Sequence, residues 1–169
     1  VLANRPAQLQ PFLREVEITA MTLSYKMVLL DAFQELDGWR TPPSLAALAQ
    51  RSWQVLQRRR PLLADLPDAM RETQDGTLGA WQRYWRENPV NAWVGGNAAT
   101  AANAYFKAAD QHFAPSFSVD AAERDVLASL VQELVDYRLA SYESRKAATT
   151  GSGNVIPFPR QKVARTELP

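Results

Sequence analysis

The sequence predicts a mainly α-helical domain with one small β-hairpin, organised like a winged helix. Apolar residues recur at three- and four-residue spacing in two stretches, 21–36 and 41–59, which is typical of amphipathic helices. Aromatic residues flank a short polar turn within 105–119, which favours a hairpin. A strongly capped amphipathic helix follows from Asp120. Helices followed by a hairpin and another helix are typical of modules that bind nucleic acid or partner proteins and rarely catalyse.

The composition fits one soluble globular domain. The chain has 169 residues, of which 46% are hydrophobic and 22% are charged, and this is enough for one domain with its own core. Nineteen lysines and arginines against 18 aspartates and glutamates leave a net charge of +1. Nucleic-acid binding would therefore require basic residues gathered in a local patch. Cysteine is absent, which excludes disulfides, thiolate metal sites and a cysteine nucleophile, and which agrees with a cytoplasmic location.

The two ends suggest a segment of a longer protein. The first residues, Val1–Pro6, have neither an initiator methionine nor the apolar core of a signal peptide. The last residues, Glu167–Pro169, close no element. No apolar run approaches the roughly 20 residues that a membrane-spanning helix needs, so no membrane partner is expected.

The first part of the chain is expected to be helical. Residues 8–17 predict a short helix, and residues 21–36 a longer one with a broad apolar stripe. Gly38 is expected to end the second helix by taking the left-handed C′ conformation, which glycine adopts without steric cost. The next helix starts at Thr41–Ser44, because either hydroxyl can cap it and proline is tolerated in the first turn. Pro61 ends that helix, since its ring prevents continuation.

The middle of the chain is less regular. Residues 62–76 are mixed, with one short helical turn. Residues 78–87 are helical by pattern and are expected to stop near Asn88–Pro89. A further break at Gly95–Asn97 precedes a run of small residues, 98–104, for which the pattern leaves helix and loop both open.

A hairpin and a long helix follow. Residues 105–119 predict the hairpin, with Pro115 limiting its second strand to a sheet edge. Asp120 and Glu123 predict a capping box at the start of the last helix. The apolar face of that helix is expected to comprise Leu127, Leu130, Val131, Leu134, Tyr137 and Ser141, widened by Val126 and Leu139.

The domain is expected to end near Lys146. Its predicted extent is 1–146, as one helical winged-helix-like unit. Residues 147–154 have the composition of a flexible linker. Residues 155–160 look extended and would need a partner surface to order them, so 147–169 is predicted to be linker and tail.

No residue constellation indicates catalysis or metal binding. His112 is the only histidine and no cysteine accompanies it, so a turn or surface position is expected rather than a zinc site. The carboxylate pairs Asp31 with Glu35 and Glu133 with Asp136 have the spacing of solvated helix faces. No nucleotide-binding motif is present. This segment is therefore not expected to be catalytic, and no cofactor or metal is expected.

Clustered basic residues give the functional signal. Arginine forks bind phosphates bidentately, and exposed aromatic side chains can stack on unpaired bases. Three consecutive arginines end the 41–59 helix, and two more alternate with aromatic residues in 81–86. Lys26 lies inside an apolar helix, so its head must reach solvent, an acid or a phosphate. The predicted nucleic-acid-binding residues are Lys26, Arg58, Arg59, Arg60, Arg83, Arg86 and, in the hairpin, Lys107.

The same residues allow a purely structural interpretation. Tryptophans can fill the core while the arginines are solvated helix ends with partly buried stems. For Trp53, Trp81 and Trp93 the core position is the preferred prediction. For Arg58–Arg60 the two interpretations stay open, because cations at a helix end also complement the helix dipole.

Three segments, Ser24–Leu30, Asn88–Trp93 and Leu130–Tyr142, together resemble an accessory region of certain bacterial helicases. These are large DEAD/DEAH-box (superfamily 2) helicase-like proteins of restriction and phage-defence type, in which such a region follows the motor. The resemblance covers about residues 25–145. It implies an auxiliary module whose parent protein carries any ATPase or nuclease activity elsewhere, and it supplies no active-site residues.

Two functions are therefore expected, in order. The first is a DNA-binding or substrate-positioning accessory domain of a larger helicase- or restriction-type protein, with affinity dominated by phosphate contacts. The second is a docking module for other domains or subunits of such a protein. An apolar patch together with paired-off arginines would favour the second function.

Overall fold

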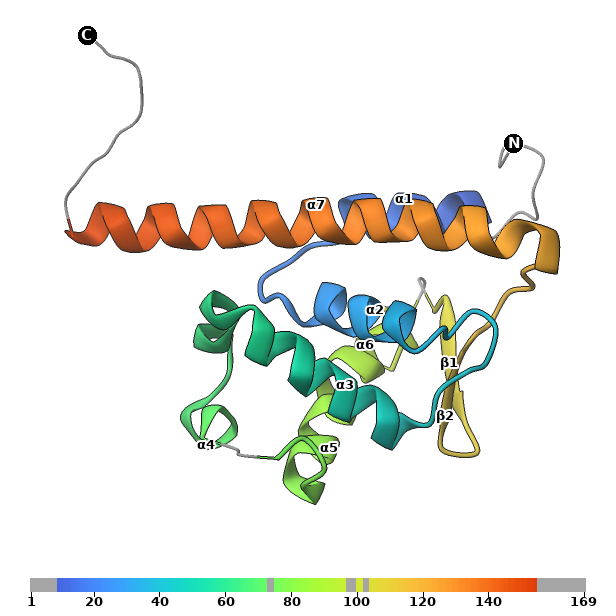
Figure 1. Cartoon of the computed structure of the whole chain (residues 1–169), viewed down its shortest axis with the longest axis horizontal. Helices are drawn as coiled ribbons and strands as arrows, with labels where there is room; N and C mark the ends of the chain where they lie inside the picture. The colour runs from blue at the N-terminus through green and yellow to red at the C-terminus, as the bar shows by residue number, and fades with distance from the viewer. Residues whose placement is uncertain (1–8, 73–74, 97–99, 102–103, 155–169) are drawn as a thin grey trace, which may run out of the picture.

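The computed structural model describes residues 9–72, 75–96, 100–101 and 104–154, with side chains up to Ala148. It confirms a mainly helical chain with one two-stranded antiparallel sheet. In chain order, labelled as in Figure 1, the elements are α1 (Leu9–Ile18), α2 (Tyr25–Glu35), α3 (Leu45–Arg58), the 3₁₀ helix η2 (Arg60–Asp65), α4 (Asp68–Arg71), α5 (Gly79–Trp85), the π turn η3 (Arg86–Val90), α6 (Asn91–Trp93), β1 (Phe106–Ala109), β2 (His112–Pro115) and α7 (Ala121–Asn154).

The helices stack in layers around α2. Helices α1 and α7 lie side by side along one face, and α2 lies directly beneath them (Figure 1). On its other side α2 contacts α3 and η3. Tyr25 and every residue from Met27 to Phe33 are buried, so α2 is enclosed on all sides and does not present the single apolar stripe that its sequence predicts. Within the described residues, no helix is long and apolar enough to cross a membrane.

The hairpin closes one end of the core with aromatic side chains. Asp110 and Gln111 occupy its two-residue turn at φ 53° and 63°, as a type I′ turn requires. Phe106 and Phe113 point inward and stack with ring centroids 4.6 Å apart. Phe12 of α1 lies against Phe106 at 5.6 Å, in an edge-on arrangement. The hairpin prediction is confirmed, and its apolar side completes the core.

The end of α2 differs from the prediction in one residue. Asp37, not Gly38, takes the left-handed conformation, at φ 56°. Gly38 N–H donates to the carbonyl of Phe33, and Asp37 N–H donates to that of Gln34, which is the Schellman pattern with Asp37 at C′. Glycine is needed at position 38 for space, because a Cβ there would lie 2.4 Å from the ring of Phe33.

The next helix follows its prediction closely. Ser44 is the N-cap of α3, with its Oγ accepting from the Ala47 N–H at 3.0 Å. Beyond Arg58 the chain tightens into η2, which has Pro61 in its first turn. Proline is tolerated there because the first turn needs no amide donor from it.

Pro89 does not end the helix that begins at Gly79. The chain passes through it as the π turn η3 and continues as α6 to Trp93. Asn91 N–H donates to the carbonyl of Arg86, five residues earlier, and the Asn88 side chain donates to the Tyr84 carbonyl at 2.8 Å. The wider turn accommodates a residue that lacks an amide hydrogen, so the predicted stop at Asn88–Pro89 is wrong. Gly95, at φ 73°, follows the end of α6, and much of the 97–104 run lies outside the described residues.

The buried face of α7 is displaced from the predicted one. Its buried apolar residues, among the side chains described, are Leu127, Val131, Val135, Leu139 and Tyr142. Tyr137, predicted to be in the core, is 69% exposed, and Val126 is 41% exposed. Two adjacent apolar rows run along α7, and the row facing α2 is the one spaced by four residues. Leu130 and Leu134 of the other row are half-buried.

The two ends of α7 can be compared with the predicted capping box and the predicted linker. Glu123 reaches back to the Asp120 N–H at 3.4 Å, as half of the expected capping box. At the other end the backbone stays helical to Asn154, over the residues 147–154 for which the sequence predicts a flexible linker. The predicted tail, 155–169, lies outside the described residues.

One long arginine on α7 holds the end of α1. The Arg138 guanidinium donates to the carbonyls of Val16 and Glu17 at 2.9 and 2.7 Å, and to that of Thr19 at 2.6 Å. These groups lie at the C-terminal end of α1, where carbonyls have no partner within the helix. The last turn of α1 is therefore capped by a side chain from the other end of the chain.

Asp65, at the end of η2, joins three helices through a buried carboxylate. Oδ2 accepts from the Ser24 backbone N–H at 2.9 Å, just before α2. Oδ1 accepts from the Tyr142 hydroxyl at 2.7 Å and lies 3.3 Å from Nζ of Lys146, both on α7. The Asp65 side chain is 0% exposed. Burial and the neighbouring carboxylate raise the pKa of Tyr142 above its usual value.

The steric role of Gly38 gives a first test. Gly38→Ala should lower the free energy of unfolding by about 1–3 kcal/mol, because the added methyl overlaps the Phe33 ring. Gly79→Ala is the matched control: a Cβ there meets nothing within 4 Å, and helix propensity should make it neutral or stabilising by up to about 1 kcal/mol. Urea unfolding of the two variants measures the difference, and equal effects would contradict the packing described here.

The Asp65 network gives a second test. Asp65→Ala should cost about 3–5 kcal/mol, since it leaves the buried Ser24 amide without its acceptor and leaves the Tyr142 hydroxyl only the longer contact to the Thr22 carbonyl at 3.4 Å. Asp68→Ala, three residues on with a side chain 89% exposed, should cost at most about 1 kcal/mol. Chemical denaturation compares them; a loss for Asp65→Ala no larger than that of its control would show that the network contributes little.

Candidate nucleic-acid interface

The Lys26 side chain makes its contacts within the protein. Its Nζ donates to Thr19 Oγ1 at 2.6 Å, lies 3.7 Å from Glu15 Oε2, and sits 4.4 Å from the ring centroid of Trp93. Its side chain is 17% exposed. Burial lowers its pKa, and Glu15 opposes that shift. Of the three destinations predicted for this lysine, the structure shows an acid.

Arg58 and Arg59 are also engaged within the protein. Arg58 pairs with Glu35 of α2, which holds the pKa of Arg58 above its usual value, and Arg51 joins the same carboxylate at 3.3 Å. Arg59 makes a two-pronged pair with Glu143 of α7, at 3.1 and 2.9 Å. A fork on a carboxylate is the preferred arginine geometry. These two arginines therefore connect α3 to the helices above it.

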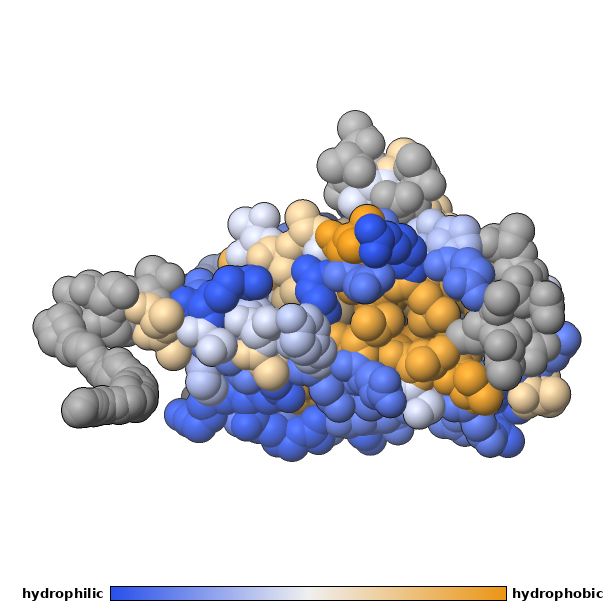
Figure 2. Space-filling view, turned by 90° about the horizontal axis from the view of Figure 1, so that it is seen from above, coloured by the Kyte–Doolittle hydropathy of each residue, from blue (hydrophilic) through white to orange (hydrophobic). Residues whose placement is uncertain are grey.

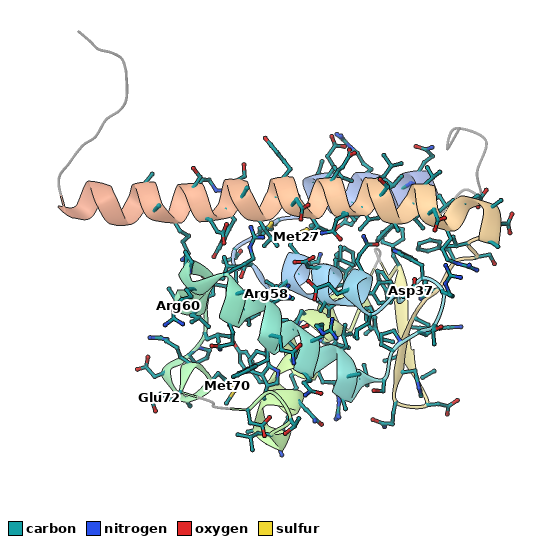
Figure 3. All side chains as sticks on the ribbon, in the orientation of Figure 1. Met27, Asp37, Arg58, Arg60, Met70 and Glu72 are labelled. Atoms are coloured by element: carbon teal, nitrogen blue, oxygen red, sulfur yellow. The ribbon has the colours of Figure 1, made fainter. Side chains whose placement is uncertain are left out.

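The other four predicted residues lie on the surface. Within the described residues, Arg60, Arg83, Arg86 and Lys107 are exposed and have no acidic side chain within ion-pair distance. Arg60 stands apart, at the η2 end of the molecule (Figure 3). Arg83 and Arg86 are three residues apart and so lie on one side of the α5–η3 helix. The sequence-predicted set thus divides between structural and available cations.

The tryptophans offer no stacking surface. Trp81 and Trp93 are 0% exposed, as the core prediction requires, and Trp53 is half-buried. Trp81 stacks on Trp85, with ring centroids 4.9 Å apart. Their flat faces are covered, so the aromatic part of the 81–86 signal belongs to the core.

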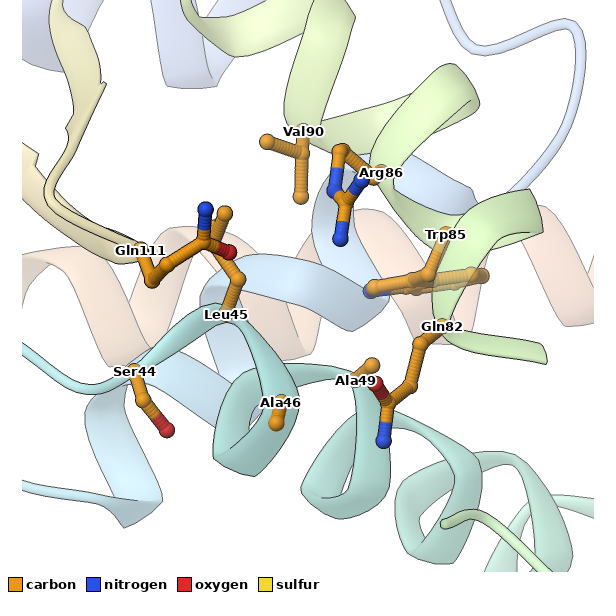
Figure 4. A pocket seen from close by; sticks show the side chains of 9 residues that line it. All are labelled: Ser44, Leu45, Ala46, Ala49, Gln82, Trp85, Arg86, Val90 and Gln111. Carbon is orange, nitrogen blue, oxygen red and sulfur yellow. The ribbon is translucent and has the colours of Figure 1, made fainter. Parts of the chain in front are cut away.

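A hollow of about 260 Å³ opens beside Arg86. It lies between the first turn of α3, the α5–η3 helix and the hairpin turn, and the Arg86 guanidinium points into it (Figure 4). Its lining residues are Ser44, Leu45, Ala46, Ala49, Gln82, Trp85, Arg86, Val90 and Gln111. Arg86 and Trp85 belong to the 81–86 segment that the sequence singles out, whereas Gln82 and Gln111 have no sequence signal, because only the fold brings the hairpin turn beside this helix.

Main-chain hydrogen bonds hold the hairpin against α3. Leu45 N–H donates to the Gln111 carbonyl at 2.8 Å, and Phe113 N–H donates to the Pro43 carbonyl at 2.9 Å. Ser44 and His112 form an isolated antiparallel bridge between these bonds. The segment before α3 is therefore joined to the hairpin by one β-bridge and two main-chain hydrogen bonds, and the turn that rims the hollow is fixed relative to α3.

His112 lies at the surface of the hairpin, as expected. Its ring is exposed, and Nδ1 is 2.7 Å from the carbonyl oxygen of Asp110. Within the part of the chain that the structure describes, no three His, Cys, Asp or Glu side chains gather in a group that could hold a metal ion. The chemistry that the site offers is hydrogen-bond donation and positive charge.

Comparison with protein-family models, with curated proteins and with solved structures finds no match. The resemblance to a helicase accessory region therefore stays a prediction from the three segments that suggested it.

Two consecutive arginines test the division between structural and available cations. Arg59→Ala should lower the free energy of unfolding by about 1 kcal/mol, because it removes the two-pronged pair with Glu143. Arg60→Ala should stay within about 0.5 kcal/mol of the parent. Thermal and urea unfolding provide the comparison; an equal response from both residues would argue against Arg59 as a connection to α7.

Proposed function

We propose that this domain binds nucleic acid through the face formed by α5–η3, the first turn of α3 and the hairpin. The observation that carries the proposal is that Arg83 and Arg86 are exposed and have no ion-pair partner among the described residues, with Arg86 lining a hollow that has further hydrogen-bond donors. Lys107, on the strand leading to the hairpin turn, adds a third available cation. The proposed site does not include Lys26, Arg58 and Arg59, because each of them forms an ion pair with an acidic side chain of the protein.

The order of elements supports a winged-helix-like mode of binding. Helix α2, the β-bridge residue Ser44, helix α3, the α5–α6 helix and the hairpin follow one another in the order of such a module. The helix that precedes the hairpin would then be the one presented to a groove, and the hairpin would contact the backbone beside it. Arg83 and Arg86 lie on that helix. It runs from α5 to α6 without a break, since Pro89 is absorbed in η3.

The electrostatics favour binding of modest strength. With a net charge of +1, the domain has no overall field to attract a polyanion, and the local cations must supply the phosphate contacts. Two or three such contacts on duplex DNA would give a logarithmic salt dependence with a slope of about −2 to −3. Such affinity suits an accessory domain that positions DNA for a larger helicase- or restriction-type protein.

A second candidate is protein docking through the opposite face. The outer side of α1 and α7 carries apolar surface bordered by polar residues (Figure 2). Leu13 of α1 and Leu130 and Leu134 of α7 line a shallow hollow there. Exposed apolar area of this kind is often a contact surface for another domain or subunit. Lys26, Arg58 and Arg59 are paired within the protein, which also favours this alternative.

Charge reversal separates the two candidates. Arg83→Glu with Arg86→Glu should weaken binding to short DNA at low salt by at least about tenfold, since each phosphate that is no longer neutralised keeps its condensed counterions. The control Arg14→Glu with Arg71→Glu makes the same change in net charge at exposed positions on α1 and α4, and it should bind nearly as the parent does. Fluorescence anisotropy at two salt concentrations is the measurement. Absence of binding by the folded parent at low salt would overturn the DNA proposal and favour docking.

A further inference from the structure

We infer that the hollow beside Arg86 receives a single unpaired nucleobase, with its acceptor-rich edge toward Trp85 and Arg86. The inference rests on the proposed function and deepens it: the preferred target would be a strand with at least one unstacked base. Three observations carry it, namely an unpartnered buried donor, the shape and lining of the hollow, and the polar groups on its rim.

The donor is the indole N–H of Trp85. This side chain is 0% exposed, and its Nε1 has no hydrogen-bond partner among the described residues. In Figure 4 the nitrogen-bearing edge of the ring faces the hollow. Trp81, one turn earlier and stacked on it, donates its own indole N–H to the Ala49 carbonyl at 2.7 Å. Among the described residues Trp53 and Trp85 both have a buried indole N–H without an acceptor, and that of Trp85, which lines the hollow, would be satisfied by an acceptor on a ligand there.

The lining of the hollow fits a flat, largely apolar group. Leu45, Ala46 and Ala49 form the α3 wall, and Val90 lies across from them on η3. The volume of about 260 Å³ lies just below the 300–1,000 Å³ of pockets for drug-sized ligands, so one ring system fills it. A phosphate that entered the hollow would lose hydrogen bonds to water that these apolar walls cannot replace, which is unfavourable for a charged group. A phosphate is better placed outside, at exposed Arg83.

The rim supplies the groups that read a base edge. Arg86 offers a guanidinium fork and Gln111 an amide that both donates and accepts, whereas the Gln82 amide nitrogen donates to the Thr77 carbonyl at 3.1 Å and leaves its oxygen as an acceptor. Trp85 adds one further donor. An arginine fork pairs best with the two acceptors O6 and N7 of guanine. The donors therefore favour guanine over the other bases.

The hairpin turn holds its part of the rim in place. Gln111 has a positive φ of 63° in the type I′ turn, and its carbonyl is fixed by the Leu45 N–H. Its side chain is therefore presented from a rigid backbone. Base recognition needs such a preformed edge, because flexible donors lose ordering entropy on binding.

The test compares two tryptophans that differ in their hydrogen bonding. Trp85→Phe keeps an aromatic ring and removes the unpartnered donor, so it should lower the unfolding midpoint only by the cost of the lost ring volume, while lowering affinity for a single-stranded oligothymidine carrying one central guanine by about tenfold. Trp81→Phe removes a satisfied hydrogen bond, so it should lower the unfolding midpoint and leave the guanine preference intact. Anisotropy with the guanine-containing strand, the all-thymidine strand and a duplex, together with urea unfolding, gives all the readouts.

A second variant fills the hollow without touching a donor. Ala46 is exposed on α3 and lines the hollow, so Ala46→Phe should abolish the guanine preference and lower the affinity for the guanine-containing strand to that for the all-thymidine strand. Gln54→Phe, at an exposed position further along α3, is its control and should change neither. Two outcomes would overturn the base-binding inference while DNA binding through Arg83 and Arg86 stands. One is a parent protein without a guanine preference, and the other is a guanine preference that survives both Trp85→Phe and Ala46→Phe. Failure of the parent to bind any oligonucleotide would overturn both.

Discussion

The buried carboxylate of Asp65 is the constraint on which the arrangement of the helices depends. A buried carboxyl group is costly unless its oxygens accept hydrogen bonds, and Asp65 receives them from the start of α2 and the middle of α7. Its backbone carbonyl also accepts from Tyr25, whose hydroxyl in turn contacts that of Tyr84 on α5. One residue of a short 3₁₀ helix thus sets α2, α5 and α7 relative to one another.

The elements of the proposed interface are held in place by their contacts with this core. Helix α3 is attached to α2 and α7 through Arg58 and Arg59, and the hairpin is attached to α3 by main-chain hydrogen bonds around Ser44. The hollow between them is therefore a preformed feature of the resting fold. Cations that hold the scaffold lie on its upper side, whereas Arg83 and Arg86 stay available because no acidic side chain among the described residues pairs with them.

Structural features that depend on neighbouring residues in the chain could be predicted from the sequence, whereas features that depend on distant residues could not. The Ser44 cap, the hairpin turn and the existence of the main helices depend on neighbouring residues, and these predictions are confirmed. The conformation of Asp37, the passage through Pro89 and the exposure of Tyr137 depend on what packs nearby, which no local pattern encodes. The same holds for the site. Arg59 and Arg60 look alike in sequence, and only the fold brings Glu143, 84 residues away, to one of them.

The hydrogen bonds from Arg138 of α7 to carbonyls at the end of α1 connect the first helix of the fold to the last. Helix α1 also places Phe12 against the aromatic side chains of the hairpin. During synthesis, α1 leaves the ribosome long before either partner exists. About 100 residues separate it from α7, which at typical translation rates means roughly 5 to 20 s. Throughout that interval the apolar face of α1, with Leu9, Phe12 and Val16, remains uncovered, so the nascent chain offers a chaperone-binding segment that the finished domain conceals.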